Sequence, residues 1–416
     1  MAPQTAGLGT RYLTDMTDDG PASHDSEAGR PLPAAAVSLA TISREWGRIG
    51  CIGFGGPPTH IALLRRVCVE QRHWLPPQEF EDGIAATNLL PGPASTQLAI
   101  FCAWRLRGVP GALVGGLSFI LPGLIAILIL SSIFLADNPP VWVLGAAAGA
   151  GAAVPAVALR AASGLIPASR RRLGTRRSAH ARWLGYALLG GASAALIGPY
   201  LVLVLIGCGL AEISLRNALP SRPRTLPAIV PVLFGQTIAI GWIVPLIWVA
   251  FKVGALSYGG GFVIVPLMQH DAVTTYHFMT ASQFLNAVAL GQLTPGPVVQ
   301  TVAVVGYAAG GLAGGLLAAF VAFTPSFLFV LVGGPRFDQL RKSASVQSFL
   351  TGAGPAVIGA IAGSAIPLGM LLHQPWQVVV ALSALAWLFV VRRGVVSALL
   401  LAGIAGVGFA LWGLPV

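Results

Sequence analysis

The chain alternates between long apolar stretches and short polar segments, and the length of the apolar stretches indicates its class. Residues 112–135, 141–167 and 350–372 approach or exceed the roughly 20 apolar residues that a helix needs to cross a bilayer core. Glycine and proline recur inside these stretches, where neighbouring helices and lined cavities can satisfy the backbone of a broken helix. The pattern predicts an all-α polytopic membrane protein with broken or re-entrant helices.

Composition supports this class and excludes others. Of the 416 residues, 55% are hydrophobic and only 9% are charged, which is more apolar surface than one soluble core hides. The lipid bilayer is therefore the predicted solvent. The net charge is +11, but no basic cluster is interleaved with stacking aromatic residues, so we expect no nucleic-acid partner. The cysteines and histidines lack metal-ligand spacing, and no HExxH or GxSxG motif is present, so we predict no metal, no cofactor and no enzyme.

A shift of 204 residues aligns two long segments of the chain without a gap, and each segment covers roughly 120 residues. The alignment places Gly50 on Gly254, Gly55 and Gly56 on Gly259 and Gly260, Phe80 on Phe284, and Pro91-Gly92-Pro93 on Pro295-Gly296-Pro297. The chain therefore contains an internal repeat.

Basic residues flank opposite ends of the two copies. The first copy carries Arg65, Arg66, Arg72, Arg105 and Arg107 at positions whose counterparts are uncharged. In the second copy, Arg336, Arg341 and Lys342 follow the span after the motif, where the first copy has no basic residue. Short cytoplasmic loops collect Lys and Arg, so the copies are predicted to face opposite ways. Three crossings between them, near residues 183–198, 200–214 and 229–249, give the same inversion. The alternative is a tandem duplication in one orientation.

These features divide the chain into five predicted parts. They are a disordered cytoplasmic tail at 1–33, a first repeat at 34–168, basic loops and connecting helices at 169–249, a second, inverted repeat at 250–372, and C-terminal transmembrane helices at 373–416. Roughly ten to thirteen membrane segments fit this division. The sequence does not determine the oligomeric state, and a homodimer is one candidate.

The repeated Pro-Gly-Pro motifs are predicted to join half-helices. Proline suits the first turn of a helix, so Pro93 and Pro297 are expected to begin helices whose N-termini favour an anion. Polar side chains in those first turns add hydrogen-bonding groups: Ser95, Thr96, Gln97, Gln300 and Thr301. The alternative is a kink that serves only helix packing.

The glycine motifs that precede them supply a second pair of breaks. They comprise Phe54, Gly55 and Gly56 in the first copy and Tyr258, Gly259 and Gly260 in the second. Together with Pro91, Gly92, Pro295 and Gly296, these positions are predicted to line a substrate site near the membrane midplane, between the inverted halves.

Ionisable residues near these motifs are few. Glu79 and Asp82 precede the first Pro-Gly-Pro and are candidates for proton coupling, while the second copy is expected to have no acid at the same place. The alternative for both is a hydrated helix start, where acids are favourable. Arg105 and Arg107 are candidates to attract an oxyanion at the cytoplasmic mouth, although orienting the chain in the membrane also explains them. The histidines are expected to be interfacial.

The segments GFGGPPTHIALLRR, LLPGPASTQLAI, FKVGALSYGGGFVIVPLM and ALGQLTPGPVVQTVAVVGY together resemble the chromate ion transporter family in its long form with two homologous halves. The resemblance covers roughly residues 40 to 370. It implies a secondary transporter in the bacterial inner membrane that exports chromate from the cytoplasm and gives chromate resistance. A sulfate-type oxyanion importer or exchanger is the alternative, because chromate and sulfate are both tetrahedral dianions.

Overall fold

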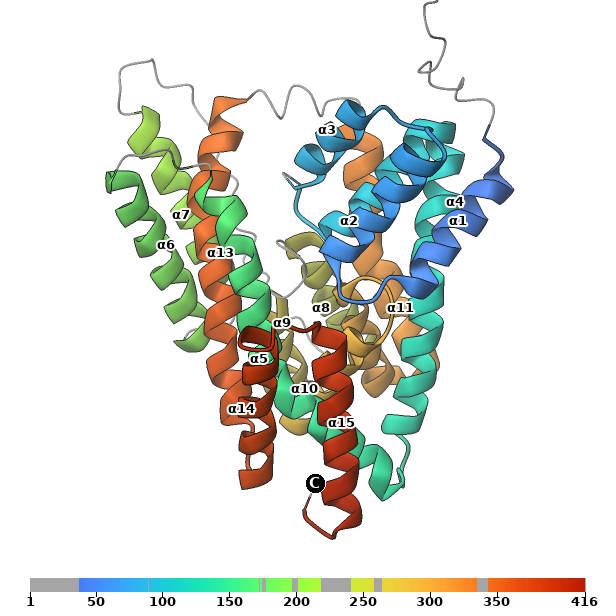
Figure 1. Ribbon diagram of the computed structural model, residues 1–416, viewed down its shortest axis with the longest axis vertical. Coiled ribbons are helices and arrows are strands. Elements are labelled where there is room, and N and C mark those ends of the chain that lie inside the picture. Colours follow the sequence, from blue (N-terminus) through green and yellow to red (C-terminus); the bar gives the residue numbers. More distant parts are fainter. Residues whose placement is uncertain are drawn as a thin grey trace, which may run out of the picture.

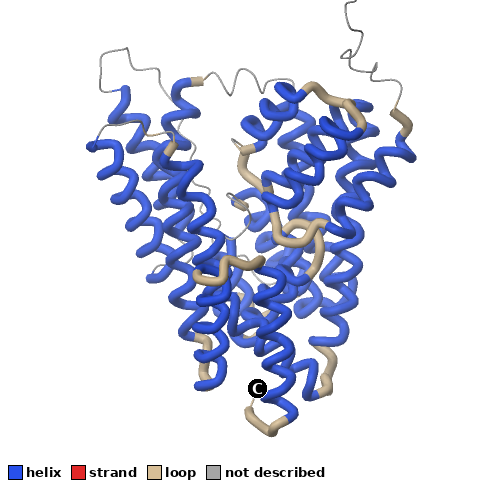
Figure 2. Tube along the Cα trace, viewed as in Figure 1, coloured by secondary structure: helices blue, strands red, loops and turns tan. Residues whose placement is uncertain are grey.

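The computed structural model describes residues 37–88, 90–171, 173, 177–196, 201–217, 241–257, 264–334 and 343–415. These residues form helices joined by short loops, and no strand occurs among them (Figure 2). The predicted all-α class is confirmed. The predicted tail, residues 1–33, lies outside the described residues, as does most of the third crossing predicted between the copies at 229–249.

The first copy and the hairpin that follows it begin the chain. Their elements are α1 (Leu39–Ile52), α2 (Pro57–Arg65), the π-helical turn η2 (Arg66–Gln71), α3 (Pro77–Thr87), α4 (Ala94–Phe134), α5 (Val141–Arg170), α6 (Arg177–Leu196) and α7 (Leu201–Asn217).

The second copy repeats this order. Its elements are α8 (Ile243–Leu256), α9 (Ile264–Gln269), the π-helical turn η4 (His270–Thr275), α10 (Ala281–Leu293), the 3-10 turn η5 (Val298–Gln300), α11 (Thr301–Gly333), α13 (Ala344–Met370), α14 (Pro375–Phe389) and α15 (Val395–Leu411).

Helix α4 reverses its direction at Gly108. The backbone leaves helical geometry at Arg107 and Gly108, where Gly108 has φ 59° and ψ −147°, a conformation that glycine tolerates and other residues rarely adopt. A Cβ atom placed on Gly115 would lie 2.4 Å from the Cβ of Ala103. Twelve residues of continuous helix would separate these positions by about 18 Å. Residues 94–106 therefore form a half-helix that folds back against residues 109–134.

Helix α11 makes the same turn. Gly311 has φ 60° and ψ −150°, and a Cβ atom on Gly306 would lie 2.7 Å from the Cβ of Ala318. Each copy thus contains a half-helix after its Pro-Gly-Pro motif, followed by one long helix. The sequence pattern predicts a half-helix on each side of the Pro-Gly-Pro motif. It does not predict the tight turn, at Gly108 or Gly311, that ends the half-helix after the motif.

The short helices of the two copies lie at different heights of the molecule (Figure 1). In Figure 1, α1, α2 and α3 lie in the upper part, whereas α8, α9 and α10 lie lower. The α6–α7 hairpin is likewise at the upper left, and α14 and α15 are at the bottom. Helices α6 and α7 pack against α13, and α14 and α15 pack against α5, so each hairpin covers the long helix of the other copy.

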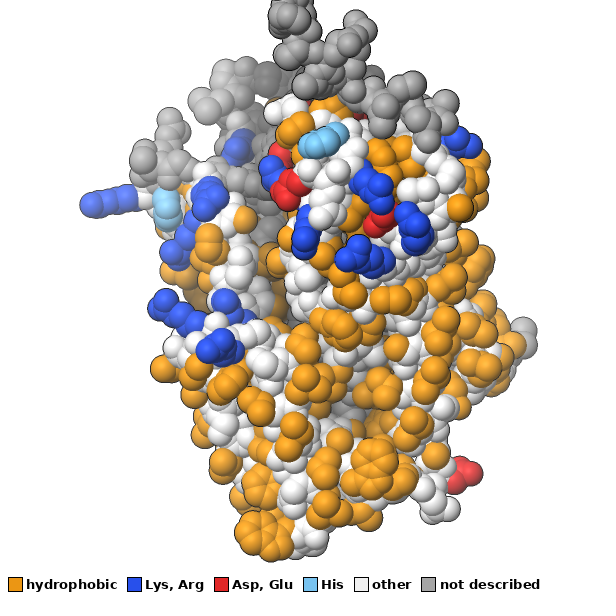
Figure 3. Space-filling model, turned by 45° about the vertical axis from the view of Figure 1, so that its right-hand side comes forward, with side chains coloured by type: hydrophobic (Ala, Val, Ile, Leu, Met, Phe, Trp, Pro, Cys, Tyr) orange, Lys and Arg blue, Asp and Glu red, His pale blue; other side chains and the backbone are white. Residues whose placement is uncertain are grey.

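The surface of the protein suits a lipid environment. Among the described residues, four helical segments are long and apolar enough to cross a membrane by length and composition: Ala94–Phe134, Val141–Arg170, Val298–Gly333 and Ala344–Met370. Leu117, Leu121, Ile125 and Ile129 form an exposed stripe at every fourth position of α4. On the face shown in Figure 3, hydrophobic side chains cover the lower part, and Lys and Arg gather in the upper part. The protein is a membrane protein.

Candidate functional site

The two Pro-Gly-Pro turns begin the helices that the sequence predicts. Pro93 is the N-cap residue of α4, and Pro297 is the N-cap residue of η5, which continues into α11. The first N–H groups of such helices lack partners within the helix, and the helix dipole places about half a positive charge there. Both helix starts are buried in the protein, so each offers an electropositive end to the interior.

Crossed hydrogen bonds join each Pro-Gly-Pro turn to the glycine motif of the other copy. The N–H of Gly92 donates to the carbonyl oxygen of Ser257 at 2.5 Å, and the N–H of Gly296 donates to the carbonyl oxygen of Gly53 at 3.0 Å. The 204-residue shift relates both donors and both acceptors. We use the name 'the crossing' for the two Pro-Gly-Pro turns together with Ser257 and Gly53. From here on, the name refers to this set of residues and not to a membrane-spanning helix. The structure thus brings each Pro-Gly-Pro turn into contact with the residue that directly precedes the glycine motif of the other copy.

The geometry of the first turn requires glycine. Gly92 has φ 119°, and a Cβ atom placed on it would lie 2.4 Å from Nε2 of Gln97 and 3.5 Å from the carbonyl oxygen of Gly254. Gly296 has φ 103°, and a Cβ atom placed on it would lie 3.1 Å from Nε2 and Oε1 of Gln300. The absence of a side chain therefore allows the helix starts and the neighbouring backbone to approach each other closely.

His60 extends the crossing within the first copy. Its ring is fully buried, with Nε2 2.8 Å from the carbonyl oxygen of Gly53 and Nδ1 3.2 Å from Oγ of Ser95. Because a carbonyl oxygen only accepts, Nε2 carries the proton and Nδ1 accepts from the Ser95 hydroxyl. The expectation of an interfacial histidine is wrong at this position. The second copy has Ile264 there, so the two halves of the site differ chemically.

Most polar side chains in the first turns of the helices donate to backbone carbonyls. Nε2 of Gln97 donates to Pro91 at 2.6 Å, Nε2 of Gln300 donates to Ile120 at 2.9 Å, and Oγ1 of Thr301 donates to Val298 at 2.8 Å. These bonds fix the shape of the turns. The Gln300 bond also ties the second copy to α4 of the first.

Several buried polar atoms at or near the crossing have no hydrogen-bond partner within the described part of the chain. Three of these atoms can donate: Thr96 Oγ1, Ser257 Oγ and Gln292 Nε2. The Oε1 atoms of Gln97 and Gln300 accept only and are also without a partner. A buried polar group without a partner is costly, and such groups commonly indicate a water or a ligand. The three donors suit the oxygens of an anion.

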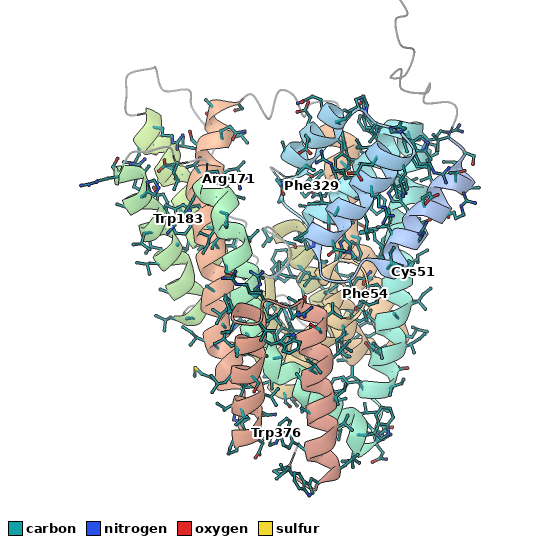
Figure 4. The ribbon with its side chains drawn as sticks, in the orientation of Figure 1. Cys51, Phe54, Arg171, Trp183, Phe329 and Trp376 are labelled. Atoms are coloured by element: carbon teal, nitrogen blue, oxygen red, sulfur yellow. The ribbon has the colours of Figure 1, made fainter. Side chains whose placement is uncertain are left out.

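The remaining predicted lining residues are placed only in part. Gly55 and Gly56 have φ 93° and 79° and begin α2, and Figure 4 shows Phe54 near mid-height, where its side chain is exposed. Tyr258, Gly259 and Gly260 lie outside the described residues.

The predicted coupling acids and mouth arginines lie away from the crossing. Glu79 is in the first turn of α3 and pairs with Arg105, while Asp82 accepts from Nε2 of Gln78 at 3.2 Å. Eight residues of helix place Glu79 about 12 Å from the end of α3 that leads into the first Pro-Gly-Pro. Arg107 is in the turn that reverses α4. These groups surround the outer ends of the half-helices.

The second copy holds an acid that the sequence analysis overlooked. Asp271, in η4, is 5% exposed, and its Oδ2 lies 2.5 Å from Nζ of Lys252. Asp271 precedes α10, the helix that corresponds to the one carrying Glu79 and Asp82 in the first copy. The signal was a Lys and an Asp 19 residues apart on either side of the glycine motif, a spacing that has no helical or strand periodicity. Within the same described ranges, no group of three His, Cys, Asp or Glu residues is arranged to hold a metal ion.

Known proteins resemble this chain over most of its length. It is 31% identical over 349 residues to a chromate transport protein of Cupriavidus metallidurans, covering 82% of this chain and 85% of that one. It is 28% identical to a probable chromate transport protein of Synechococcus elongatus, covering 90% and 96% of the two chains, and 28% identical to a chromate transport protein of Pseudomonas aeruginosa, covering 89% and 92%. No solved structure matches.

The chromate transporter family profile matches residues 40–213 and 244–408. The first match runs from α1 into α7, and the second runs from α8 into α15, so each includes the hairpin that covers the other copy. Together the two matches cover most of the chain. The chain therefore belongs to the chromate transporter family.

Proposed function

We propose that this protein exports chromate from the cytoplasm across the bacterial inner membrane and so gives chromate resistance. The names of its relatives support chromate as the substrate. The crossed bonds of Gly92 and Gly296 are the structural observation that carries the proposal, because they bind the turn before each helix N-terminus to the backbone of the other copy. Ser257, one of the bonded residues, also has a buried hydroxyl without a described partner.

The substrate is bound at the crossing. A tetrahedral dianion needs several converging donors once water is removed. Thr96, Ser257 and Gln292 supply side-chain donors, and the helices after Pro93 and Pro297 supply N–H groups and their dipoles.

Transport follows from the arrangement of the two copies. The crossing contacts both copies at equivalent positions, so a rocking of one copy against the other can expose it to either side in turn. The basic residues at the upper end in Figure 3 support a cytoplasmic location for that end, where Arg105 and Arg107 attract the oxyanion. Glu79 and Asp82 are the proton-coupling groups at the same end.

A sulfate-type importer or exchanger is the second candidate function. The donors named above recognise a tetrahedral oxyanion, and sulfate has the same shape and charge as chromate. Direction and competition distinguish the two: an exporter concentrates chromate inside inverted vesicles, whereas a sulfate importer lets intact cells accumulate sulfate.

The test is chromate flux into inverted membrane vesicles with and without this protein, before and after the proton gradient is collapsed. We expect chromate accumulation that depends on the protein, and unchanged accumulation would overturn export. Pro93→Ala and Pro297→Ala should each reduce flux while the protein stays in the membrane, because the helix starts lose their fixed geometry. Full flux in both variants would refute the site at the crossing.

A further inference from the structure

The ion pair between Lys252 and Asp271 is the most enclosed cation–carboxylate contact of the second copy. The Lys252 side chain is 15% exposed and the Asp271 side chain is 7% exposed, with 2.5 Å between Nζ and Oδ2. Nζ also lies 5.2 Å from the centre of the Trp248 ring, which adds a cation–π contact. Charge enclosed at this depth of a membrane protein is expensive and is commonly functional.

Lys252 differs from the other described basic residues in burial. The arginines in ion pairs elsewhere have side chains that are 36% to 72% exposed. It also differs in type, because Lys252 and Lys342 are the only lysines among the 25 basic residues of the chain. A lysine presents a compact charge on a flexible stem, which can change partners more easily than a guanidinium held by several fixed bonds.

Lys252 lies beside the crossing. It precedes Ser257, whose carbonyl accepts the Gly92 N–H, by five residues of α8, which is about 7.5 Å along the helix axis. The carbonyl of Gly254, two residues further along α8 than Lys252, approaches the position of a Gly92 Cβ to 3.5 Å. The Lys252 side chain now lies over Trp248, on the N-terminal side of this position, so it has to turn toward the C-terminal end of α8 to meet a bound oxyanion.

The positive charge that the two helix N-termini supply at the crossing is smaller than the negative charge of a dianion, and one further cation would balance it. The two helix N-termini there together contribute about one positive charge. Thr96, Ser257 and Gln292 are neutral, whereas chromate and sulfate each carry two negative charges. Lys252 supplies the missing charge, since it is the most buried Lys or Arg side chain in the ion pairs of the described residues.

We propose that Lys252 binds the transported oxyanion, and that Asp271 is the counter-ion to which Lys252 returns when the oxyanion leaves. The inference rests on the proposed function and names a residue of the same site. Asp271 neutralises Lys252 between transport events and competes with bound oxyanion, which speeds release. The first copy has Arg48 and Val67 at the equivalent positions, so this exchange of partners belongs to the second copy alone.

The test compares chromate KM and maximum flux in inverted vesicles for the wild type, Lys252→Gln and Asp271→Asn, with each variant's amount in the membrane measured. Lys252→Gln should raise KM about tenfold or more, because a charge partner of the dianion is lost. Asp271→Asn should lower KM about tenfold and also lower the maximum flux, because the competitor for Lys252 is removed and release slows.

Arg72→Gln is the matched control. Arg72 pairs with buried Glu45 at 2.7 Å in the first copy, at a comparable place between the first helix and the π-helical turn. Its loss should leave chromate KM unchanged. If Lys252→Gln and Asp271→Asn both reduce flux with KM unchanged, the pair is structural and the inference is wrong.

A second measurement needs no variant. Modification of Lys252 by an amine-reactive reagent, followed by mass spectrometry of its peptide in the purified wild-type protein, should slow when molybdate, a tetrahedral dianion that does not oxidise the reagent, is present. Equal rates with and without molybdate would overturn the role of Lys252. Wild-type vesicles without chromate flux would instead refute the proposed function, so the two failures are distinguishable.

Discussion

Gly92→Ala tests whether the geometry of the crossing governs transport. The substitution places a Cβ at a backbone with φ 119° and within 2.4 Å of the Gln97 amide. Alanine at such a φ costs about 1–3 kcal/mol. Gln97 is flexible and can move aside, but it then loses its 2.6 Å bond to Pro91, which contributes about 0.5–1.5 kcal/mol. The expected destabilisation is about 2–4 kcal/mol.

Gly108→Ala is the matched control for backbone strain. Gly108 also has a positive φ, of 59°, but a Cβ there would meet no atom within 4 Å. It lies in the turn of α4, at the far end of the half-helix from the crossing. The control therefore carries the strain of about 1–3 kcal/mol without the displaced glutamine.

The assay is chromate flux per molecule in vesicles, together with the melting temperature of each purified variant. We expect Gly92→Ala to lose at least about tenfold in flux, equivalent to about 1.4 kcal/mol in the barrier to transport, and Gly108→Ala to keep most of it. Equal flux in the two variants would show that only backbone strain matters and would refute the argument from the crossing.

Three further predictions concern the donors and the helix contacts. Thr96→Val should raise chromate KM about threefold to thirtyfold without lowering the melting temperature, because it removes a buried hydroxyl that has no described partner; unchanged KM in the flux assay would contradict this. Glu212→Gln should lower stability by about 1–3 kcal/mol, measured by thermal unfolding in detergent, because Glu212 pairs with an arginine on α6 at 3.0 Å and one on α7 at 2.8 Å. Gly359→Leu should destabilise the protein by more than about 2 kcal/mol, because a Cβ atom at this position would lie 1.8 Å from the Ala187 carbonyl oxygen of α6. Gly354→Leu on the same helix is the control: a Cβ atom there would meet no atom within 4 Å, so this variant should unfold at the wild-type temperature.

The sequence was sufficient to predict the class, the repeat and the broken helices. Hydrophobic length identifies membrane helices because the bilayer fixes it, and Pro-Gly-Pro interrupts a helix for local steric reasons. Both signals depend on neighbouring residues only. The start of α4 after Pro93 and of η5 after Pro297 therefore agrees with the sequence pattern.

The contacts that make the site could not be predicted in this way. The bond from Gly92 to Ser257 joins residues of different copies, and the 204-residue shift shows that the copies correspond without showing how they pack. The sequence predicts an interfacial His60 because the histidines have no metal-ligand spacing. Only the packing of α2 against α4 buries its ring beside Ser95.

The pairing of Lys252 with Asp271 illustrates the same limit. Counting the basic residues of each loop gives the orientation of a chain in the membrane but does not show which acid a basic residue contacts. The partner of Lys252 lies beyond the glycine motif, on an element that the chain reaches only after a break. A long-range ion pair has no periodic signature, so it emerges only when the helices are placed in space.

The crossed bonds also determine whether the two copies could be made as separate polypeptides. Each turn is completed by a backbone oxygen from the other copy: Ser257 serves Gly92, and Gly53 serves Gly296. A polypeptide that held one copy alone would lack these partners. It would need a second chain to supply them. Two such half-length chains made in unequal amounts would leave the excess chain without these backbone partners.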